Sequence, residues 1–326
     1  MEKVINAMLA MQRYPWEQGV CAQALYEAGY DELWIPMAYD AVKRMDHDGR
    51  LAMIGGGEAI SDPAANGEVC LRAYEKTGDG FFKEGADAML DYLMNKATRT
   101  EDGVILHNDV SFFEGFTKYQ LWADGLYMVP PFLAVMGELN EALAQIRGYK
   151  RHLYDAERQL FFHVKDIAKG EFVRKLHWAT GNGWALMGLA RVIEAALKAG
   201  RRDIADELAA FMTELLDGLL VWTTEDGRFR DILDDETSFV DGTSAVMMAA
   251  AVYRGIALVF CRRIRRPGIR RQLTRPLRRF RGILMSTGFC MRFADARVLW
   301  NPGLRPRPRR RILWPERGGC DSWGQM

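Results

Sequence analysis

Apolar residues recur at helical spacing over most of residues 1–260, and runs of alternating β-branched residues are few. Some segments are rich in Ala, Leu and Met on every side, which indicates buried helices, and others carry charges along one face, which predicts helices at the periphery. The buried segments begin at Cys21, Val69 and Ala185. The peripheral helices are expected at Glu32–Arg44, Gly80–Asn95 and Arg201–Asp217.

The buried helices follow short polar turns at a regular interval. The first turn lies at Trp16, and the next four contain Gly67, Gly125, Gly183 and Gly242, which are 58, 58 and 59 residues apart. Fixed spacing of this size is the signature of a repeated supersecondary unit. Because a peripheral helix follows each buried one, the unit is a helical hairpin with its first helix inside a ring. We therefore predict an all-α fold, an (α/α)6 toroid, with five hairpins visible and the sixth expected near residue 300.

Charge divides the chain into two compositions near Val259. The whole chain of 326 residues has a net charge of +1, but residues 261–326 hold eighteen Arg, no Lys and three acids, so they carry +15 and leave −14 for residues 1–260. We predict a barrel domain at 1–260 and an aberrant Arg-rich tail at 261–326 that replaces the last hairpin. A basic arm that contacts nucleic-acid phosphates is the alternative. The absence of Lys and the position of the tail argue against it.

The remaining composition excludes several classes of protein. Five Cys provide no disulfide framework, and the N-terminal segment shows no secretory signal, so a cytoplasmic protein is expected. The apolar stretch from Gly242 to Cys261 is interrupted by Arg254, which favours a buried helix over a membrane span. The glycines at 55–57 lack the Lys and Ser/Thr of a phosphate loop, and the acids at 46–48 are too few for a calcium loop. No cofactor or metal is predicted, and the oligomeric state is left open.

Acidic residues stand at the expected N-termini of three inner helices: Asp62, Asp124 and Asp241. Each could be a helix N-cap, which stabilises by about 1 kcal/mol. They could also line the shared mouth of the ring, where neighbouring carboxylates raise one another's pKa. For Asp62 and Asp241 both interpretations stay open. Asp124 lies between Trp122 and Tyr127, an apolar setting expected to hold its carboxyl partly protonated, and a catalytic role is favoured there.

Five motifs, taken together, resemble those of the unsaturated glucuronyl and rhamnogalacturonyl hydrolases, a group of six-hairpin glycosidases. The W-x-D-G-x-Y-M block from Trp122 and the W-x-T-G-N-G-W block from Trp178, in this order and spacing, are the most specific. The resemblance extends from residue 13 to about residue 256. Its other blocks are Arg13-Tyr-Pro-Trp-Glu-Gln-Gly, Ser61-Asp-Pro-Ala-Ala-Asn-Gly and Asp241-Gly-Thr-Ser-Ala.

The resemblance implies an unusual glycoside hydrolysis. Such enzymes remove a 4,5-unsaturated uronic acid from the non-reducing end of oligosaccharides that polysaccharide lyases release. A carboxylic acid protonates C4 of the vinyl ether, water adds at C5, and the resulting hemiketal opens and expels the aglycone. Ordinary glycosidases need two carboxyls across the glycosidic bond, whereas here one can serve as acid and then as base. The implied substrate is a rhamnogalacturonan-derived oligosaccharide, as in pectin degradation.

The resemblance also assigns residues. Asp124 is the implied general acid/base, and Asp62 the second acidic residue, which contacts sugar hydroxyls. Trp16 and Trp184 would stack on the sugar, although Trp184 could also be core, and His163 would contact the substrate or be a satisfied strand histidine. Further candidates for substrate binding are Gln120, Trp122, His177 and Trp178.

Three positions depart from the family pattern or stay outside the predicted site. We expect His107 to be a solvated loop residue. Phe113 stands where the family carries a His before the W-x-D-G block, and Thr180 stands where some members carry an Arg. Recognition of the uronate or of the aglycone is therefore left open by the sequence.

Two other classes of function compete with the hydrolase. One is a non-catalytic or inactivated carbohydrate-binding toroid of the same ancestry, which would bind unsaturated uronides without consuming them. The other is a different toroid enzyme such as a sugar epimerase, which would bring paired catalytic His. The chain has five His and no evident pair at the mouth, which disfavours the epimerase.

We predict that the tail arises from a shifted reading frame. Permissible codons for Ile283–Arg310, read one nucleotide upstream, can encode a peptide ending in GPSAEAQA, which resembles the family's last inner helix. Codons in the gene that exclude this alternative reading would contradict the prediction. A ring without its closing hairpin exposes apolar helix flanks, at about 1.5–3 kcal/mol for each large side chain. The chain is therefore expected to be less stable and less active than a frame-restored version.

Overall fold

The computed structural model describes the backbone of residues 2–54, 59–110 and 118–261, and side chains as far as residue 255 apart from the gaps between these ranges. Within these ranges long helices alternate in pairs, as the repeat predicts. The expected sixth hairpin, most of the Arg-rich tail and Phe113 lie outside the described residues.

The first helices of the pairs begin within four residues of the predicted polar turns; the fourth begins at Ala179, so Gly183 lies inside it. Pro15 starts the first of them at the N1 position, where its fixed φ suits a helix and its missing N–H costs nothing. In the third pair the inner helix is divided in two at Pro130, because proline cannot continue the preceding hydrogen-bond ladder. These helices are α2 (Pro15–Glu27), α4 (Gly67–Thr77), α6 (Gly125–Met128) with α7 (Pro130–Val135), α9 (Ala179–Lys198) and α11 (Thr243–Cys261).

The second helices of the pairs confirm the predicted peripheral segments to within a few residues. Their apolar faces are buried against the inner helices and their charged faces point outward. The N-terminal helix α1 (Glu2–Met11) precedes the first pair, the 3₁₀ helix η1 (Asp62–Asn66) leads into α4, and the π-helical turn η2 (Tyr92–Lys96) ends the second pair. The second helices are α3 (Asp31–Lys43), α5 (Gly80–Asp91), α8 (Leu139–Leu153) and α10 (Arg202–Val221).

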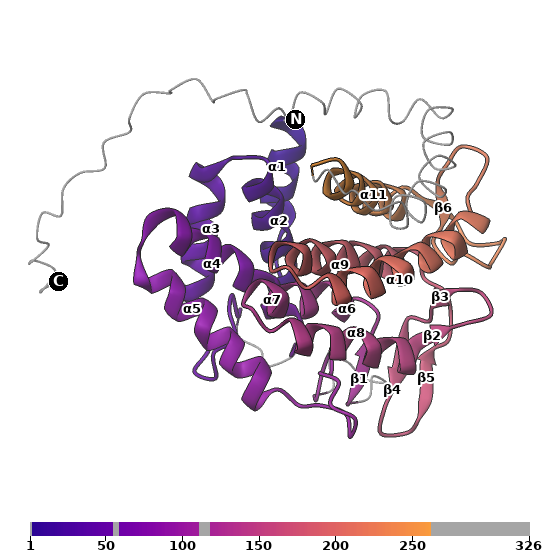
Figure 1. The fold of residues 1–326 in the computed structure, drawn as a ribbon, viewed down its shortest axis with the longest axis horizontal. Helices are drawn as coiled ribbons and strands as arrows, with labels where there is room; N and C mark the ends of the chain where they lie inside the picture. The colour runs from indigo at the N-terminus through magenta and orange to yellow at the C-terminus, as the bar shows by residue number, and fades with distance from the viewer. Residues whose placement is uncertain (1, 55–58, 111–117, 262–326) are drawn as a thin grey trace, which may run out of the picture.

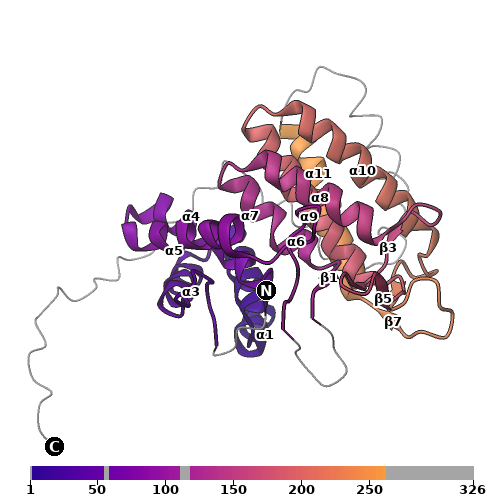
Figure 2. The same ribbon diagram turned by 90° about the horizontal axis from the view of Figure 1, so that it is seen from below.

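The pairs form a curved arrangement. α9 packs against α10 and α11, and α2 packs against α3, as Figure 1 shows. Figure 2 shows α3, α4 and α5 on one side and α8, α10 and α11 on the other, with α7 between the two groups. Within the described ranges, no helix is both long and apolar enough to cross a membrane.

Glycine permits the closest approaches between inner helices. A Cβ atom on Gly188 of α9 would lie 2.1 Å from the carbonyl oxygen of Leu126 in α6, and one on Gly19 of α2 would lie 2.5 Å from the carbonyl carbon of Ala65 in η1. Both contacts are with backbone, which cannot move aside as a flexible side chain can. Gly188 and Gly19 therefore determine how closely α9 approaches α6, which follows Asp124, and how closely α2 approaches η1, which contains Asp62.

Short strands connect the helix pairs at one end of the ring. β1 (Gln120–Trp122), β4 (Val164–Asp166) and β5 (Glu171–Arg174) form an antiparallel sheet in the order β1-β4-β5, in which Trp122 pairs with Val164. This register places the end of β1 beside residue 163, before β4. Two smaller ladders pair β2 (Tyr154–Asp155) with β3 (Leu160–Phe161) and β6 (Phe229–Arg230) with β7 (Val240–Asp241).

A network of charges, buried at Arg191 and Glu68 and more exposed at Glu27, joins four inner helices. Arg191 of α9 pairs with Glu68 of α4 and, at 2.6 Å, with Glu27 of α2, while Arg254 of α11 pairs with Glu27 and Glu194. Burial alone would raise the pKa of Glu68, but the charge and hydrogen bond of Arg191, together with the charges of Arg72 and Arg254, outweigh it and lower that pKa. Glu68 therefore contributes stability above its unfolded pKa that is lost as pH falls through its folded pKa.

Replacing Arg191 by Leu is expected to lower the free energy of unfolding by about 3–5 kcal/mol, because it leaves the buried carboxylate of Glu68 without its main partner. The matched control is Arg147→Leu, which removes an exposed pair with Glu207 and is expected to cost about 0–1 kcal/mol. Urea unfolding at neutral pH measures both. Equal losses in the two variants would contradict a structural role for the network.

Candidate active site

Asp124 occupies the N-cap position of α6, directly after β1, but its side chain makes no capping hydrogen bond. The backbone N–H of Ala123 donates to the carbonyl oxygen of His163 at 3.0 Å, which joins this turn to the β3–β4 connection. Asp124 Oδ2 then lies 3.6 Å from His163 Nε2. Oδ2 is buried and has no hydrogen-bond partner among the residues that the structure describes. Oδ2 can therefore accept a hydrogen bond from a ligand.

Asp62 begins η1 and lies in the same electrostatic environment as Asp124. Its Oδ1 accepts a 3.4 Å hydrogen bond from Ser61 Oγ and lies 3.7 Å from His107 Nδ1. Burial raises the pKa of Asp62; attraction to His107 opposes this rise, and the negative charge of Asp124 adds to it. The two acidic residues singled out by their motifs therefore lie near enough for the charge of one to act on the other.

His107 is a correction to the sequence analysis, which placed it in solvent. The side chain is buried, at 6% exposed, its Nδ1 lies 2.9 Å from Ser61 Oγ, and its ring stacks on Trp122 with centroids 4.3 Å apart. The prediction was wrong because the partner hydroxyl is 46 residues away in sequence, next to Asp62. His107 thus belongs to the wall of the candidate site.

Aromatic side chains form the next part of the candidate site, beside Asp124. Trp122 meets His163 edge to face at 5.6 Å between centroids, and His163 packs against Trp178 at 4.4 Å. Trp122 Nε1 donates a 2.8 Å hydrogen bond to Gln120 Oε1, which fixes the indole. Four candidate residues, Gln120, Trp122, His163 and Trp178, are thereby brought together beside the carboxyl of Asp124.

His163 is only 3% exposed, yet neither ring nitrogen has a hydrogen-bond partner among the described residues. A buried polar atom left unpaired costs about 1–3 kcal/mol, so such atoms in native proteins call for an explanation. The 3.6 Å approach to Asp124 is too long for a normal hydrogen bond. Both groups are therefore available to hydrogen-bond to a polar molecule placed beside them.

Trp16 and Trp184 lie together on another set of aromatic contacts. Their rings meet edge to face with centroids 6.1 Å apart, and Trp184 also packs on Tyr127 at 4.8 Å. Tyr127 donates a hydrogen bond to Gln23 Oε1, which anchors the cluster to α2. Trp184 is nearly covered, at 9% exposed, whereas Trp16 is only partly buried. Packing thus accounts for Trp184, and Trp16 is the more accessible of the two rings.

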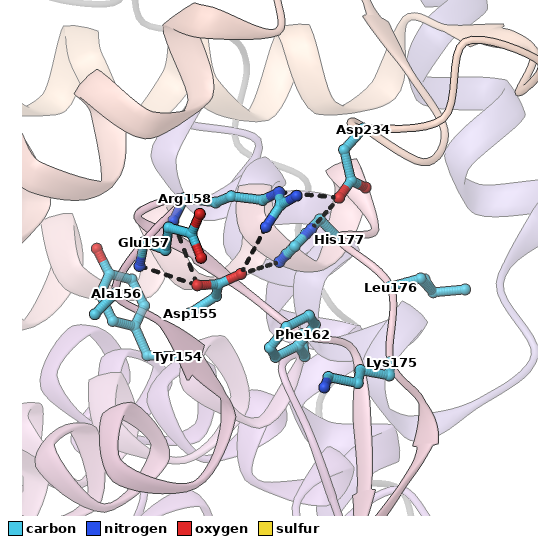
Figure 3. Close-up of a pocket in the computed structure, with 10 residues that line it drawn as sticks. All are labelled: Tyr154, Asp155, Ala156, Glu157, Arg158, Phe162, Lys175, Leu176, His177 and Asp234. Carbon is cyan, nitrogen blue, oxygen red and sulfur yellow. Dashed lines mark hydrogen bonds and ion pairs between the residues drawn. The ribbon is translucent and has the colours of Figure 1, made fainter.

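His177 faces a different cavity from Trp178, its neighbour in sequence. This cavity has a volume of about 590 Å³, and Figure 3 shows His177 between two carboxylates. Nδ1 of the imidazole lies 2.7 Å from Asp234 Oδ2 and Nε2 lies 3.2 Å from Asp155 Oδ2. Arg158 approaches both carboxylates, at 3.7 Å and 3.5 Å. Contacts with Asp155 and Asp234 therefore account for the burial of His177, and no motif in the sequence indicated either acid.

The third acid at a helix start, Asp241, is a local cap. Its carboxylate accepts hydrogen bonds from the backbone N–H of Thr243 at 2.9 Å and from the hydroxyl of the same residue at 3.1 Å. Capping therefore explains Asp241, in contrast to Asp124. In the part of the chain that the structure describes, no group of three or more His, Cys, Asp or Glu side chains could hold a metal ion.

The sequence model of the family described as Glycosyl Hydrolase Family 88 matches residues 2–274. The chain therefore belongs to this family and is a glycosidase. It is similar to the unsaturated rhamnogalacturonyl hydrolase YesR of Bacillus subtilis, with 26% identity over 269 residues that make up 77% of this chain and 74% of the relative.

Solved structures agree on the fold. A family 105 glycoside hydrolase of C. acetobutylicum has a TM-score of 0.62 at 19% identity and covers 80% of this chain and 75% of its own. A possible member of the same family from Klebsiella pneumoniae has a TM-score of 0.62 at 20% identity and covers 80% of this chain and 68% of its own. The predicted all-α six-hairpin toroid is thereby confirmed as the fold class.

The raised pKa of Asp62 predicts that the isosteric, neutral Asp62→Asn variant melts at a higher temperature than the wild type at neutral pH. Because its pKa is higher in the folded than in the unfolded state, the Asp62 carboxylate lowers the stability of the native state at a pH where Asp62 is ionised in both states. This loss of stability disappears at a pH where Asp62 is protonated in both states. The gain should therefore shrink as pH is lowered. Asp46, whose pKa is lowered by hydrogen bonds from His47, is the control, and Asp46→Asn should give no gain. An Asp62→Asn variant that melts no higher than the wild type at neutral pH would refute this.

Proposed function

We propose that this chain removes a 4,5-unsaturated uronic acid from the non-reducing end of lyase-generated oligosaccharides, with rhamnogalacturonan-derived fragments as substrate. The family supplies the glycosidase chemistry, and similarity to YesR, an unsaturated rhamnogalacturonyl hydrolase, supports the substrate class. The observation that carries the proposal is the partly buried carboxyl of Asp124, whose buried Oδ2 has no hydrogen-bond partner among the described residues and lies 3.6 Å from His163 Nε2.

In the proposed reaction, Asp124 donates a proton to C4 of the substrate's vinyl ether. Its carboxylate then accepts a proton from the water that adds at C5, so the residue returns to its starting state. The product is a hemiketal, which opens and releases the aglycone. One carboxyl is sufficient because no glycosyl–enzyme bond forms and no water attacks the anomeric carbon.

The surrounding residues hold the sugar in this proposal. Asp62, still available beside Ser61, accepts hydrogen bonds from ring hydroxyls, and the ring nitrogens of His163 gain the polar partner that they lack. Trp122, Trp178 and the accessible Trp16 supply flat apolar faces for the sugar. The aromatic wall also limits the access of water to the reacting double bond.

A sugar-binding protein without activity is the second candidate, and the +15 charge of residues 261–326, where the sixth hairpin is expected, favours it. The two candidate functions differ in what happens to the conjugated double bond of the substrate. The hydrolase consumes the conjugated double bond and its ultraviolet absorbance declines, whereas the binding protein leaves the absorbance unchanged while heat is released on binding.

Asp124→Asn is expected to lower kcat by about 10²–10⁴-fold, because the amide can neither donate the proton to C4 nor recover one from water. The measurement is the rate of loss of ultraviolet absorbance from an unsaturated disaccharide. Asp241→Asn is the matched control, since it changes a carboxylate at another inner-helix start that serves as a cap. It should keep its activity. Full activity in Asp124→Asn would remove the mechanism, and equal losses in both variants would point to a structural effect.

A further inference from the structure

The segment between β6 and β7 is attached to the N-terminus of α9 through Asp231. Asp231 Oδ1 accepts a 2.9 Å hydrogen bond from Trp178 Nε1, and its carbonyl oxygen accepts one at 2.8 Å from the backbone N–H of Ala179. Trp178 also forms an isolated antiparallel bridge with Ile232. One residue thus fixes both the main chain and the indole plane of Trp178.

The indole of Trp178 in turn determines how the His163 ring lies. The two rings pack with centroids 4.4 Å apart and planes inclined by 32°, and the other contact of His163 is the edge of Trp122. No described residue hydrogen-bonds to either nitrogen of His163. Its orientation therefore comes from packing between two tryptophans, one of which, Trp178, is hydrogen-bonded to a segment 53 residues along the chain.

The same packing sets the distance between His163 and Asp124. His163 Nε2 lies 3.6 Å from Asp124 Oδ2, and the backbone of Ala123 is hydrogen-bonded to the carbonyl of His163. Rotation of the His163 ring would therefore change what faces the carboxyl without moving the backbone. A misplacement of about 1 Å near reacting groups can cost about 100-fold in rate.

We propose that Asp231 is a positioning residue for the reaction: through Trp178 it holds His163 against the carboxyl of Asp124. This role rests on the proposed function. Asp231 itself touches neither Asp124 nor His163, so its effect passes through the Trp178 indole. The hydrogen-bond acceptor is what matters, because a side-chain carbonyl oxygen in the same place would satisfy Trp178 equally well.

The first test compares two substitutions. Asp231→Ala removes the acceptor and should lower kcat about 10- to 100-fold with little change in KM, since the lost alignment acts on the reaction step. Asp231→Asn keeps an acceptor oxygen and should restore kcat to within a few-fold of the wild type. Asp235→Ala is the control: Asp235 lies in the same connection and accepts from the backbone and hydroxyl of Thr237. It should leave kcat unchanged.

A second measurement separates positioning from general loosening of the segment. Near-ultraviolet circular dichroism should differ between Asp231→Ala and the wild type, and the difference should vanish when both proteins also carry Trp178→Phe. The two substitutions should likewise be non-additive in kcat, because each removes the same hydrogen bond.

The possible results distinguish failure of the positioning role from failure of the proposed function. An active wild type with an inactive Asp124→Asn variant, but with Asp231→Ala as fast as the wild type, would overturn the positioning role and leave the proposed function standing. Equal losses in Asp231→Ala and Asp231→Asn, or additive effects with Trp178→Phe, would overturn it as well. A wild type that consumes no unsaturated uronide would overturn the proposed function and this role with it.

Discussion

The candidate site depends on one carboxylate oxygen, Oδ2 of Asp124, which is buried and which no described residue hydrogen-bonds. Asp124 stands at a helix start, where a carboxylate normally caps the backbone, yet it makes no such bond, and its Oδ2 is shielded from water. His163 beside it is also buried, and neither of its ring nitrogens is hydrogen-bonded by a described residue. Leaving two polar groups unsatisfied costs stability, and a protein retains such an arrangement where a ligand completes it.

The fold holds this arrangement by contacts distant in sequence. The antiparallel register of β1 with β4 brings Ala123 to His163, the glycine contact between α9 and α6 limits the spacing of their helices, and the β6–β7 segment fixes the Trp178 indole. The ion pairs of the buried Arg191 with Glu68 and Glu27 join the inner helices elsewhere. Each of these contacts acts on a segment that carries a candidate side chain. The packing of the helices and the geometry of the candidate site therefore depend on the same contacts.

The sequence predicted what periodicity and local motifs encode. The regular spacing of glycines located the inner helices, and the W-x-D-G setting distinguished Asp124 from Asp241, which the structure shows to be a cap. It could not place His107, because the partner of that ring, Ser61, lies 46 residues earlier, on the other side of the second helix pair. Asp231 escaped notice for the same reason, since an Asp in a connecting loop has no local signal until tertiary packing brings it to an indole. Short strands were also missed, because two or three residues carry too little alternation.

The most direct test of the central claim is a crystal structure of the Asp124→Asn variant with an unsaturated uronyl disaccharide bound. The account predicts the C4–C5 double bond beside residue 124, with C4 about 3–3.5 Å from its side chain, a ring nitrogen of His163 hydrogen-bonded to the sugar, and hydroxyls on Asp62. A sugar bound instead in the cavity between His177, Asp155 and Asp234, with residue 124 covered by protein, would contradict it.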